Sequence, residues 1–272
     1  MKKVLLINDI AGYGKVGMAA MLPILSYMGL PAFNLPTMLV SNTLNYGDYA
    51  QLDTTEYMRQ TLPVWQRLGF RFDAICTGLM FNPVQANVIA DFCRQQAERG
   101  CTIYVDPVMG DGGSLYHGMT EEQVQLMRQM ISVAHVAKPN YTEACLLTGI
   151  PYREEGISHD EARHLTDTIV DMGARSVVIT SCVIDGRSQV CGYDADSQTY
   201  FYHDYDIIPG LFHGTGDIFS AVLIGTKESG RTLSESTRRA MDVVSQMIDR
   251  NRDVDDHLCG IFIERCLDLL NP

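Results

Sequence analysis

Short apolar runs alternate with longer amphipathic stretches along nearly the whole chain. The short runs are continuously hydrophobic, as in strands buried on both faces, and the longer stretches place apolar residues at helical spacing. Strands that alternate with helices form a largely parallel sheet with helices on both faces, so the pattern predicts an α/β fold. The predicted strands are Lys3–Asn8, Phe72–Thr77, Thr102–Asp106, His135–Lys138 and Ser176–Thr180. The predicted helices are Val16–Met28, Thr55–Leu68, Pro83–Arg99, Glu121–Ile131, Tyr141–Thr148, Asp160–Met172, Ile218–Lys227, Leu233–Arg250 and His257–Leu270.

Two further runs, Gln189–Tyr193 and Thr199–His203, are separated by a polar turn and predict a β-hairpin. The chain has no internal repeat, low-complexity segment or linker, so we expect residues 1–272 to form a single domain. In an open α/β sheet, ligands lie beyond the carboxyl ends of the strands. The residues that directly follow the predicted strands are therefore the first candidates for a functional site.

The composition limits the partners and the location. The chain has 272 residues, of which 46% are hydrophobic, and a net charge of −12. This negative charge repels nucleic acid and anionic membranes, so we expect neither as a partner. No apolar run is long enough to span a membrane, and the apolar run near Met1 is too short for a signal peptide. The eight cysteines show no Cys-x-x-Cys pair and no zinc-binding spacing, which is typical of reduced thiols in a cytoplasmic protein.

The segment Gly214-Thr215-Gly216-Asp217 lies between a polar loop and the predicted helix that begins at Ile218. Unpaired backbone N–H groups and the positive end of a helix make such a segment an anion-binding site. A carboxylate beside a phosphate site is repulsive unless it handles a proton. The segment therefore indicates transfer of a phosphoryl group onto a hydroxyl, with Asp217 as the base.

A second glycine-rich segment, Gly12-Tyr-Gly14-Lys-Val-Gly17, matches the dinucleotide-binding pattern Gly-x-Gly-x-x-Gly. Dinucleotide sites also need an acidic residue about 20 positions further on, and no Asp or Glu occurs between Asp9 and Asp48. We therefore favour a tight glycine turn that brings a substrate close to the backbone. The Walker phosphate-binding pattern is also absent, so any nucleotide must be bound by another device.

Three more polar segments follow predicted strands. Asp106 and Asp111, in a glycine-rich turn, are hard oxygen ligands that suit Mg²⁺, although an Asp before Pro also starts turns. Asn140 and Glu143 match a helix capping box, and this structural interpretation is as strong as a functional one. Thr180-Ser181 adds two hydroxyls at the end of a buried strand.

With these segments in this order, the chain resembles the ribokinase-like superfamily and, within it, the vitamin-B6 kinases that act on pyridoxal, pyridoxine and pyridoxamine. The resemblance covers essentially the whole chain and implies a three-layer α/β/α fold with a largely parallel central sheet and a small β-hairpin. The stretches that carry it are Tyr13-Gly14-x-x-Gly17, Ser41-Asn42-x-x-x-Tyr46-Gly47, Asp106-Pro-Val-Met-Gly-Asp111 with Leu115-Tyr116, Pro139-Asn140-x-x-Glu143 with Leu146-Leu147-Thr148-Gly149, and Gly214-Thr-Gly-Asp217.

By position, the resemblance implies that Asp217 takes a proton from the 5'-hydroxymethyl group of a B6 vitamer, while the backbone of residues 214–216 binds the moving phosphoryl group. ATP is implied as the donor, with Mg²⁺ governed by Asp106 and Glu143, partly through water. A homodimer is also implied, and the need for a monovalent cation stays open. The implied ATP-binding residues are Asp106, Asp111, Asn140, Glu143, Thr180, Ser181, Gly214 and Gly216, with Thr215 completing the catalytic loop. The implied substrate-binding residues are Asp9, Tyr13, Ser41, Asn42, Thr43, Leu44, Leu79 and Asp217.

The chain departs from the B6-kinase pattern only around the substrate ring. Many members carry a serine where this chain has Asp9, a His-Thr pair where it has Thr43-Leu44, and a Gly-Tyr pair where it has Gly78-Leu79. A carboxylate at the ring would favour the positively charged aminomethyl group of pyridoxamine. An equally strong interpretation is that Asp9 caps the turn at Gly12.

Three other functions compete with this one. Hydroxymethylpyrimidine (phosphate) kinases of the same superfamily generally carry Cys at the position of Asp217, so the Asp counts against them without excluding them. Ribokinase-type sugar kinases also end in Gly-x-Gly-Asp but usually open with a longer glycine-rich segment. A non-catalytic vitamin or nucleotide sensor is disfavoured because Asp217, Asp106 and Glu143 are all present.

Overall fold

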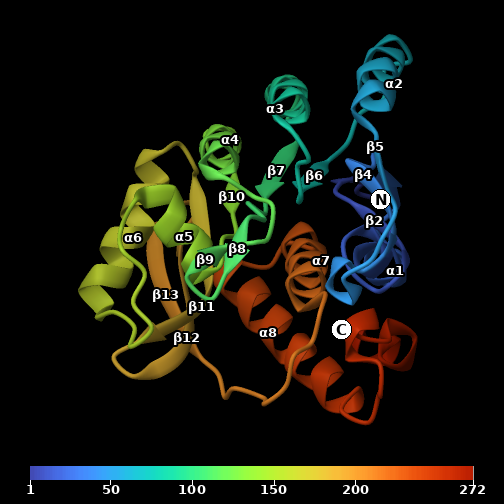
Figure 1. Ribbon diagram of the computed structural model, residues 1–272. Helices are drawn as coiled ribbons and strands as arrows, with labels where there is room; N and C mark the ends of the chain where they lie inside the picture. The colour runs from blue at the N-terminus through green and yellow to red at the C-terminus, as the bar shows by residue number, and fades with distance from the viewer. Residues whose placement is uncertain (272) are drawn as a thin grey trace. The chain divides into compact units, whose positions relative to one another are not determined.

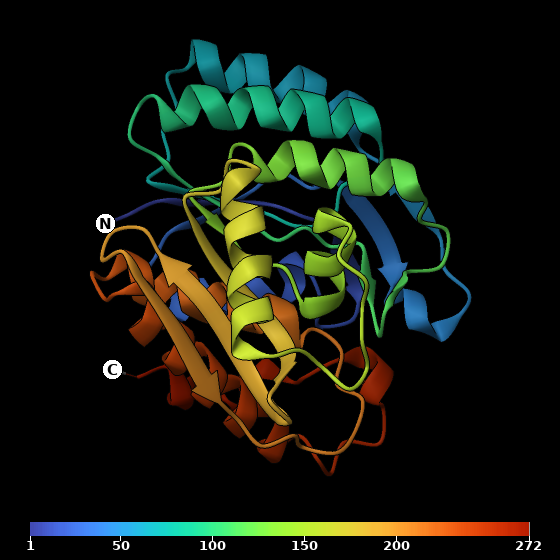
Figure 2. The same ribbon diagram turned by 90° about the vertical axis from the view of Figure 1, so that its left-hand side faces the viewer.

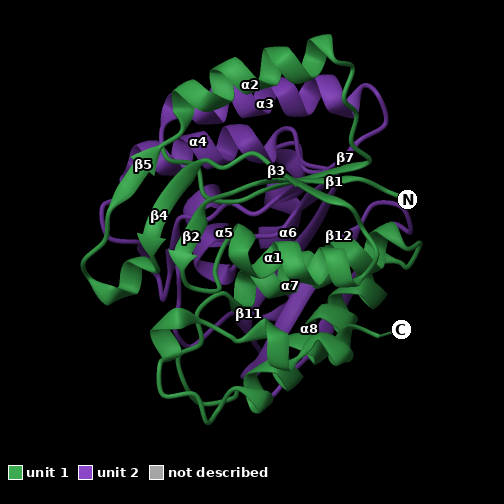
Figure 3. Cartoon of the chain, turned by 90° about the vertical axis from the view of Figure 1, so that its right-hand side faces the viewer, with its two compact units in different colours: residues 1–81, 208–272 green, residues 82–207 purple. Residues whose placement is uncertain are grey.

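The structure is a computed structural model that describes residues 1–271. These residues form two compact units (Figure 3). Figure 1 labels their helices and strands. The first unit contains residues 1–81 and 208–272, and the second contains residues 82–207. Both are mixed α/β structures with parallel strands, as the alternating pattern predicts.

The first unit contains a parallel sheet in which β1 pairs with β3 on one side and β6 on the other. All four residues of β1 are fully buried, which explains its unbroken hydrophobic sequence. The strands predicted at residues 3–8 and 72–77 are confirmed. The three strands are β1 (Val4–Ile7), β3 (Ala32–Asn34) and β6 (Ala74–Thr77).

A second, smaller sheet in the first unit was not predicted. Strand β2 (Ile10–Tyr13) pairs in parallel with β4 (Met38–Asn42), which pairs antiparallel with β5 (Gln51–Asp53). Ala11, Met38 and Val40 form its buried side, and the intervening residues are exposed. Strands this short and half-exposed leave only a weak alternating pattern in the sequence.

Helix α1 packs against α7, and α7 against α8. Helix α7 begins at Thr215, so the predicted start at Ile218 is wrong, because Gly214 takes a left-handed conformation and starts the helix earlier. The helix predicted over residues 257–270 is also wrong: three short 3₁₀ turns stand there, and Gly260, with φ of 91°, interrupts the helical path. The helices of this unit are α1 (Met18–Tyr27), α2 (Thr55–Arg67), α7 (Thr215–Glu228) and α8 (Leu233–Arg250), and the 3₁₀ turns are η1 (Leu44–Tyr46), η2 (His257–Cys259), η3 (Ile263–Arg265) and η4 (Leu267–Leu270).

The second unit contains a mixed sheet in the order β13-β12-β11-β10-β7, in which β7, β10 and β11 are parallel. Strands β11, β12 and β13 pair antiparallel (Figure 2, gold strands), and β12 and β13 form the predicted hairpin. Helices α5 and α6 pack on β11. The strands are β7 (Thr102–Val105), β8 (Gly110–Asp111), β9 (Ser114–Leu115), β10 (Val136–Ala137), β11 (Ser176–Ile184), β12 (Arg187–Asp194) and β13 (Thr199–Asp204), and the helices are α3 (Pro83–Ala97), α4 (Glu121–Ile131), α5 (Tyr141–Thr148) and α6 (His159–Asp171).

Among residues 1–271, no helix combines the length and the apolar character needed to cross a membrane.

A substitution at Gly192 in β12 tests how tightly the antiparallel strands pack. A Cβ at this position would lie 2.3 Å from the carbonyl oxygen of Val177, a backbone atom that cannot move independently. We expect Gly192→Ala to lower the free energy of unfolding by about 2–3 kcal/mol, measured by urea denaturation. The matched control is Gly225→Ala in α7, where the added Cβ would meet the flexible end of Met28 and alanine favours the helix, so the change should stay below about 1 kcal/mol. Equal losses in both variants would contradict this account of the strand.

Candidate active site

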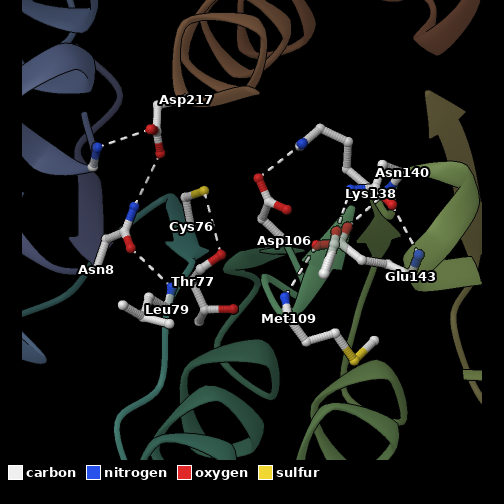
Figure 4. Close-up of polar contacts among 12 residues, drawn as sticks. Asn8, Cys76, Thr77, Leu79, Asp106, Met109, Lys138, Asn140, Glu143 and Asp217 are labelled. Atoms are coloured by element: carbon white, nitrogen blue, oxygen red, sulfur yellow. Dashed lines mark hydrogen bonds and ion pairs between the residues drawn. The ribbon is translucent and has the colours of Figure 1, made fainter. Parts of the chain in front are cut away.

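Asp217 lies at the third position of α7, where its carboxylate is half-buried (Figure 4). One oxygen accepts a hydrogen bond from the backbone N–H of Gly17, at 2.8 Å, and the other from the side-chain amide of Asn8, at 3.3 Å. Gly17 is the N-cap of α1. The carboxylate therefore sits at the N-termini of two helices, and both partial positive charges favour a negative charge there.

Asn8 follows β1 and joins three segments of the first unit (Figure 4). Its amide nitrogen donates to Asp217, while its amide oxygen accepts from the backbone N–H groups of Asp9 and Leu79. A Cβ on Gly78 would lie 2.3 Å from the Asn8 side chain, so only glycine fits there. Leu79, which the sequence predicts to bind substrate, and Asp217 are therefore hydrogen-bonded to the same asparagine.

In the glycine turn at residues 12–17, each of the three glycines lies so close to another part of the chain that a side chain would collide with it. Added Cβ atoms would lie 2.9 Å from the Ser41 carbonyl at Gly12, 2.1 Å from the Thr43 hydroxyl at Gly14, and 2.5 Å from the Asp9 carbonyl at Gly17. The Gly17 N–H, which would face a pyrophosphate in a dinucleotide site, instead binds Asp217. The pattern therefore reflects tight packing of a turn, whereas the substrate contact expected at this turn stays a prediction.

The two glycines before Asp217 differ in the space that a side chain would find. Gly214 has φ of 81°, and a Cβ there would lie 2.2 Å from the Lys15 carbonyl. Apart from its chain neighbours and the backbone of its own helix, no described atom lies within 4 Å of a Cβ built on Gly216. The Thr215 hydroxyl donates to the Phe212 carbonyl at 3.3 Å, so the side chain closes the turn while the backbone N–H groups of the first helical turn stay available for an anion.

Asp9 lies directly after Asn8 and is half-buried beside Gly17. Loss of solvent raises the pKa of its carboxyl group to about 6, and its own backbone N–H partly offsets that increase. Within residues 1–271 the carboxylate forms no hydrogen bond to Gly12, so the predicted turn cap is not observed. Among residues 1–271 no ion pair with Asp9 is seen, and both Asp9 and Asp217 approach Gly17. A cationic group that bound next to this carboxyl would lower its pKa and favour the ionised form.

The residues predicted over the substrate ring have different contacts. The Ser41 hydroxyl binds the Asn42 side chain and the Ala50 N–H, and the Asn42 amide donates to the Asp48 carbonyl, so both close the loop between β4 and β5. Thr43 is buried, and its hydroxyl has no hydrogen-bond partner among the described residues. Leu44 and Tyr13 are exposed on the surface of this unit, with 41% and 57% of their areas accessible.

The second unit carries a buried charged cluster at the ends of β7 and β10 (Figure 4). Asp106 forms an ion pair with Lys138 at 2.8 Å, and both side chains are nearly inaccessible. Glu143 accepts hydrogen bonds from the backbone N–H groups of Asn140 and Met109, at 2.8 and 3.1 Å. Burial, and then the charge of Asp106, raise the pKa of Glu143 to about 8. At neutral pH Glu143 therefore keeps its proton, and the charges of Asp106 and Lys138 balance each other.

Asn140 and Glu143 form the predicted capping box at the start of α5. The Asn140 amide also donates to the Gly110 carbonyl at 2.8 Å, and this bond ties the cap to the tight β8–β9 hairpin. Asp111 is exposed in that hairpin, where its carboxylate accepts from the Gly112 N–H. The capping interpretation is confirmed, and the same two residues also bind the backbone of Met109 and Gly110 in the segment that follows Asp106.

Thr180-Ser181 lies inside a β-bulge, since β11 continues to Ile184 beyond the predicted end at Thr180. Ile179 pairs with Cys191 and Cys182 with Gln189, so two residues of β11 face one of β12. Ser181 has φ of 60°, a left-handed conformation that is uncommon outside glycine and that clusters at functional sites. Its side chain is hydrogen-bonded to Tyr205, a residue that the sequence did not single out.

In the first unit the structure brings together Asp217, residues 214–216, Asp9 and Leu79. In the second it brings together Asp106, Asn140 and Glu143. The sequence reasoning missed Asn8, Lys138 and Tyr205 as functional contacts. The positions of Asn8 and Lys138 at strand ends could have indicated the first two, whereas Tyr205 lies in a loop without a signal.

The Gly214–Asp217 loop at a helix N-terminus and the parallel strands with polar residues at their carboxyl ends are typical of a ribokinase-like phosphotransferase. Residues 13–260 match the phosphomethylpyrimidine kinase family, and the chain belongs to this family of kinases.

Three relatives are similar over nearly the whole chain. The pyridoxine/pyridoxal/pyridoxamine kinase of Bordetella pertussis is 29% identical over 260 residues, with 91% of this chain and 88% of that protein covered. A Bacteroides thetaiotaomicron protein assigned to the phosphomethylpyrimidine kinases is 32% identical, with a TM-score of 0.95 over 100% of this chain and 94% of that chain. A second crystal form of it, with a TM-score of 0.93, contains pyridoxal. The pyridoxal kinase of Lactobacillus plantarum is 28% identical, with a TM-score of 0.89 over 99% and 96% of the two chains.

The elevated pKa of Asp9 predicts a pH-dependent stability. The folded protein keeps the proton up to about pH 6, whereas the unfolded chain loses it near the ordinary carboxyl pKa of 3.8. The proton thus stabilises the fold at low pH, and this contribution is lost as the pH rises from about 4 to above 6. We expect the unfolding free energy of wild type minus that of Asp9→Asn to fall by up to about 3 kcal/mol over this interval, since one pKa unit is about 1.4 kcal/mol. A flat difference from pH 4 to pH 8 would contradict the buried carboxyl group.

Proposed function

We propose that this protein transfers the γ-phosphoryl group of ATP to the 5'-hydroxymethyl group of a B6 vitamer, with Asp217 as the general base. The observation that carries the proposal is the position of the Asp217 carboxylate, held by Asn8 and the Gly17 N–H in the anion-binding loop. Two helix N-termini favour its ionised form, which is the form that accepts a proton.

The loop supports the second part of the reaction. As Asp217 removes the hydroxyl proton, negative charge is distributed over the oxygens of the moving phosphoryl group. Backbone N–H groups at the start of α7 would bind those oxygens, and the open surface at Gly216 leaves room for them. Gly214, fixed in its left-handed conformation against Lys15, holds the loop in place.

Asp106 and Glu143 would hold Mg²⁺, partly through water. Among residues 1–271 no group of three or more histidine, cysteine or acidic side chains could form a complete metal site. Two carboxyl groups are nevertheless the protein share typical of Mg²⁺ bound to substrate phosphates. The pKa of Glu143, raised by burial and by Asp106, fits a site that gains from a cation. When bound, Mg²⁺ neutralises phosphate charge, and Asp111, Asn140 and Thr180-Ser181 would line the nucleotide.

Relatives support a vitamin-B6 substrate, because the Bordetella and Lactobacillus proteins are pyridoxal-type kinases and the Bacteroides crystal contains pyridoxal. The second candidate is a hydroxymethylpyrimidine (phosphate) kinase, which the name of the matching family favours. Both substrates present a hydroxymethyl group on a heteroaromatic ring, so the phosphoryl-transfer residues would be the same. The homodimer, the single domain, the cytoplasmic location and the need for a monovalent cation stay predictions.

The function is tested with a panel of pyridoxal, pyridoxine, pyridoxamine and hydroxymethylpyrimidine, each with MgATP. We expect the highest kcat/KM for a B6 vitamer. Asp217→Asn should reduce kcat by about 10³-fold or more, because removing a general base and its charge affects mainly the transition state, while the dissociation constant of the vitamer changes little.

The matched control for that substitution is Asp171→Asn, the same change at an exposed position at the end of α6. It should leave kcat unchanged. A preference for hydroxymethylpyrimidine would overturn the substrate assignment, and near-normal turnover in Asp217→Asn would overturn the base.

Asp9 is proposed to set the preference among the vitamers. Its carboxylate would attract the aminomethyl group of pyridoxamine and offer nothing comparable to the aldehyde of pyridoxal. We expect Asp9→Ser to lower the ratio of kcat/KM for pyridoxamine over pyridoxal by about tenfold, the effect of losing one charge-assisted hydrogen bond. Steady-state kinetics with both vitamers at pH 8, where Asp9 is ionised, measures the ratio, and an unchanged ratio would remove Asp9 from substrate recognition.

A further inference from the structure

Residues 256–264, here called the C-terminal strap, pack on the glycine turn of the same unit. The backbone N–H of Lys15 donates to the Cys259 carbonyl at 2.6 Å, and Lys15 also forms a β-bridge with Gly260. The Lys15 ammonium group forms an ion pair with Glu264. Both the main chain and the side chain of Lys15 are therefore bound to the strap.

The Lys15 carbonyl group lies between two glycines. A Cβ on Gly214 would be 2.2 Å from it, and a Cβ on Gly260 would be 2.9 Å from it. Gly260 also approaches the His213 carbonyl, at 3.2 Å from its Cβ position. The glycine turn, the catalytic loop and the strap thus touch at one point, and the strap has no assigned part in the reaction so far.

One side chain of the strap extends this contact to the substrate-ring segments. Asp256 caps η2 with one oxygen, which accepts from the Cys259 N–H at 3.3 Å. Its other oxygen accepts from both the Tyr46 hydroxyl, at 2.5 Å, and the Tyr13 hydroxyl, at 3.3 Å. The hydrogen bond from Tyr46 holds the pKa of Asp256 below its usual value, so the carboxylate is ionised at neutral pH.

The two tyrosines form an aromatic pair at the ends of different segments. Tyr13 ends β2 and Tyr46 ends η1, and their ring centroids lie 6.0 Å apart at an angle of 58°. Tyr13 is 57% exposed, so packing alone does not restrict its rotamers. A shared charged acceptor restricts both rings and lowers the entropy that a ligand would otherwise have to remove.

We propose that Asp256 is a positioning residue that orients Tyr13 and Tyr46 as an aromatic wall for the heteroaromatic ring of the substrate. This inference rests on the proposed function, since it assigns that ring to the surface of these two tyrosines. Asp256 itself touches neither the hydroxymethyl group nor the phosphoryl group. It acts on ring binding, and the chemistry at Asp217 stays as it is.

The test distinguishes the roles of the two carboxylate oxygens of Asp256. Asp256→Asn keeps an oxygen that can cap η2 but replaces the acceptor of the tyrosine hydroxyls with an amide. We expect the KM and the dissociation constant of the preferred vitamer to rise about tenfold, while kcat at saturation and the KM of ATP change less than twofold. In the Tyr13→Phe/Tyr46→Phe background, the same substitution should have no further effect on either constant.

Two controls match the substitutions. Asp255→Asn makes the same change at the exposed neighbouring residue, and Tyr49→Phe removes a hydroxyl from an exposed tyrosine of the same loop region. Both should keep the wild-type KM, and thermal unfolding should show that all variants fold.

Two outcomes would overturn the assignment of Asp256. One is an unchanged vitamer KM in Asp256→Asn. The other is an equal loss with and without the tyrosine hydroxyls, which would mean that only the cap of η2 matters. Failure of the proposed function is distinguishable, because it would show as wild-type protein that phosphorylates none of the B6 vitamers.

Discussion

The hydrogen bond between the Gly17 N–H and the Asp217 carboxylate joins residues 200 positions apart, and the arrangement of the first unit depends on it. It brings the N-termini of α1 and α7 to one carboxylate, where their partial charges add. Such close approach of backbone segments requires glycines, and Gly12, Gly14, Gly17 and Gly214 each stand where a Cβ would collide with the chain. The glycine patterns that look like nucleotide fingerprints in the sequence therefore have a packing cause.

The second unit buries three ionisable side chains close together. Asp106, Lys138 and Glu143 are buried together, and removal of charges from water is costly unless they are paired. Lys138 pairs with Asp106, and two backbone N–H groups bind Glu143. Burial, and then the charge of Asp106, raise the pKa of Glu143 to about 8, so this carboxyl group keeps its proton at neutral pH. A nearby cation would lower that pKa and favour the ionised form, which is the basis of the proposed Mg²⁺ site.

Elements with strong periodicity were predictable. The buried strands β1 and β6, the largely buried strand β7 and helix α5, and the amphipathic helices α4 and α8 match their predicted positions closely. The small sheet of β2, β4 and β5 was not predictable, because short half-exposed strands depend on partners that are distant in sequence. Residues 257–270 have helical spacing, yet Gly260 and the contacts with Lys15 favour separate 3₁₀ turns, so tertiary packing overrode the local preference.

The sequence by itself indicated phosphoryl transfer, because residue type and position single out an anion-binding loop with a carboxylate and acidic residues after a strand. Asp217 and Asp106 were candidates on that ground, whereas the expected metal role of Glu143 came from the resemblance to the B6 kinases. Only the tertiary structure decided their partners: Asn8 binds Asp217, and Lys138 pairs with Asp106. It also decided the bulge at Thr180-Ser181 and the hydrogen bonds that Asp256 accepts from Tyr13 and Tyr46. These contacts join segments far apart in the chain, and their energies depend on distance, burial and orientation, which no local pattern encodes.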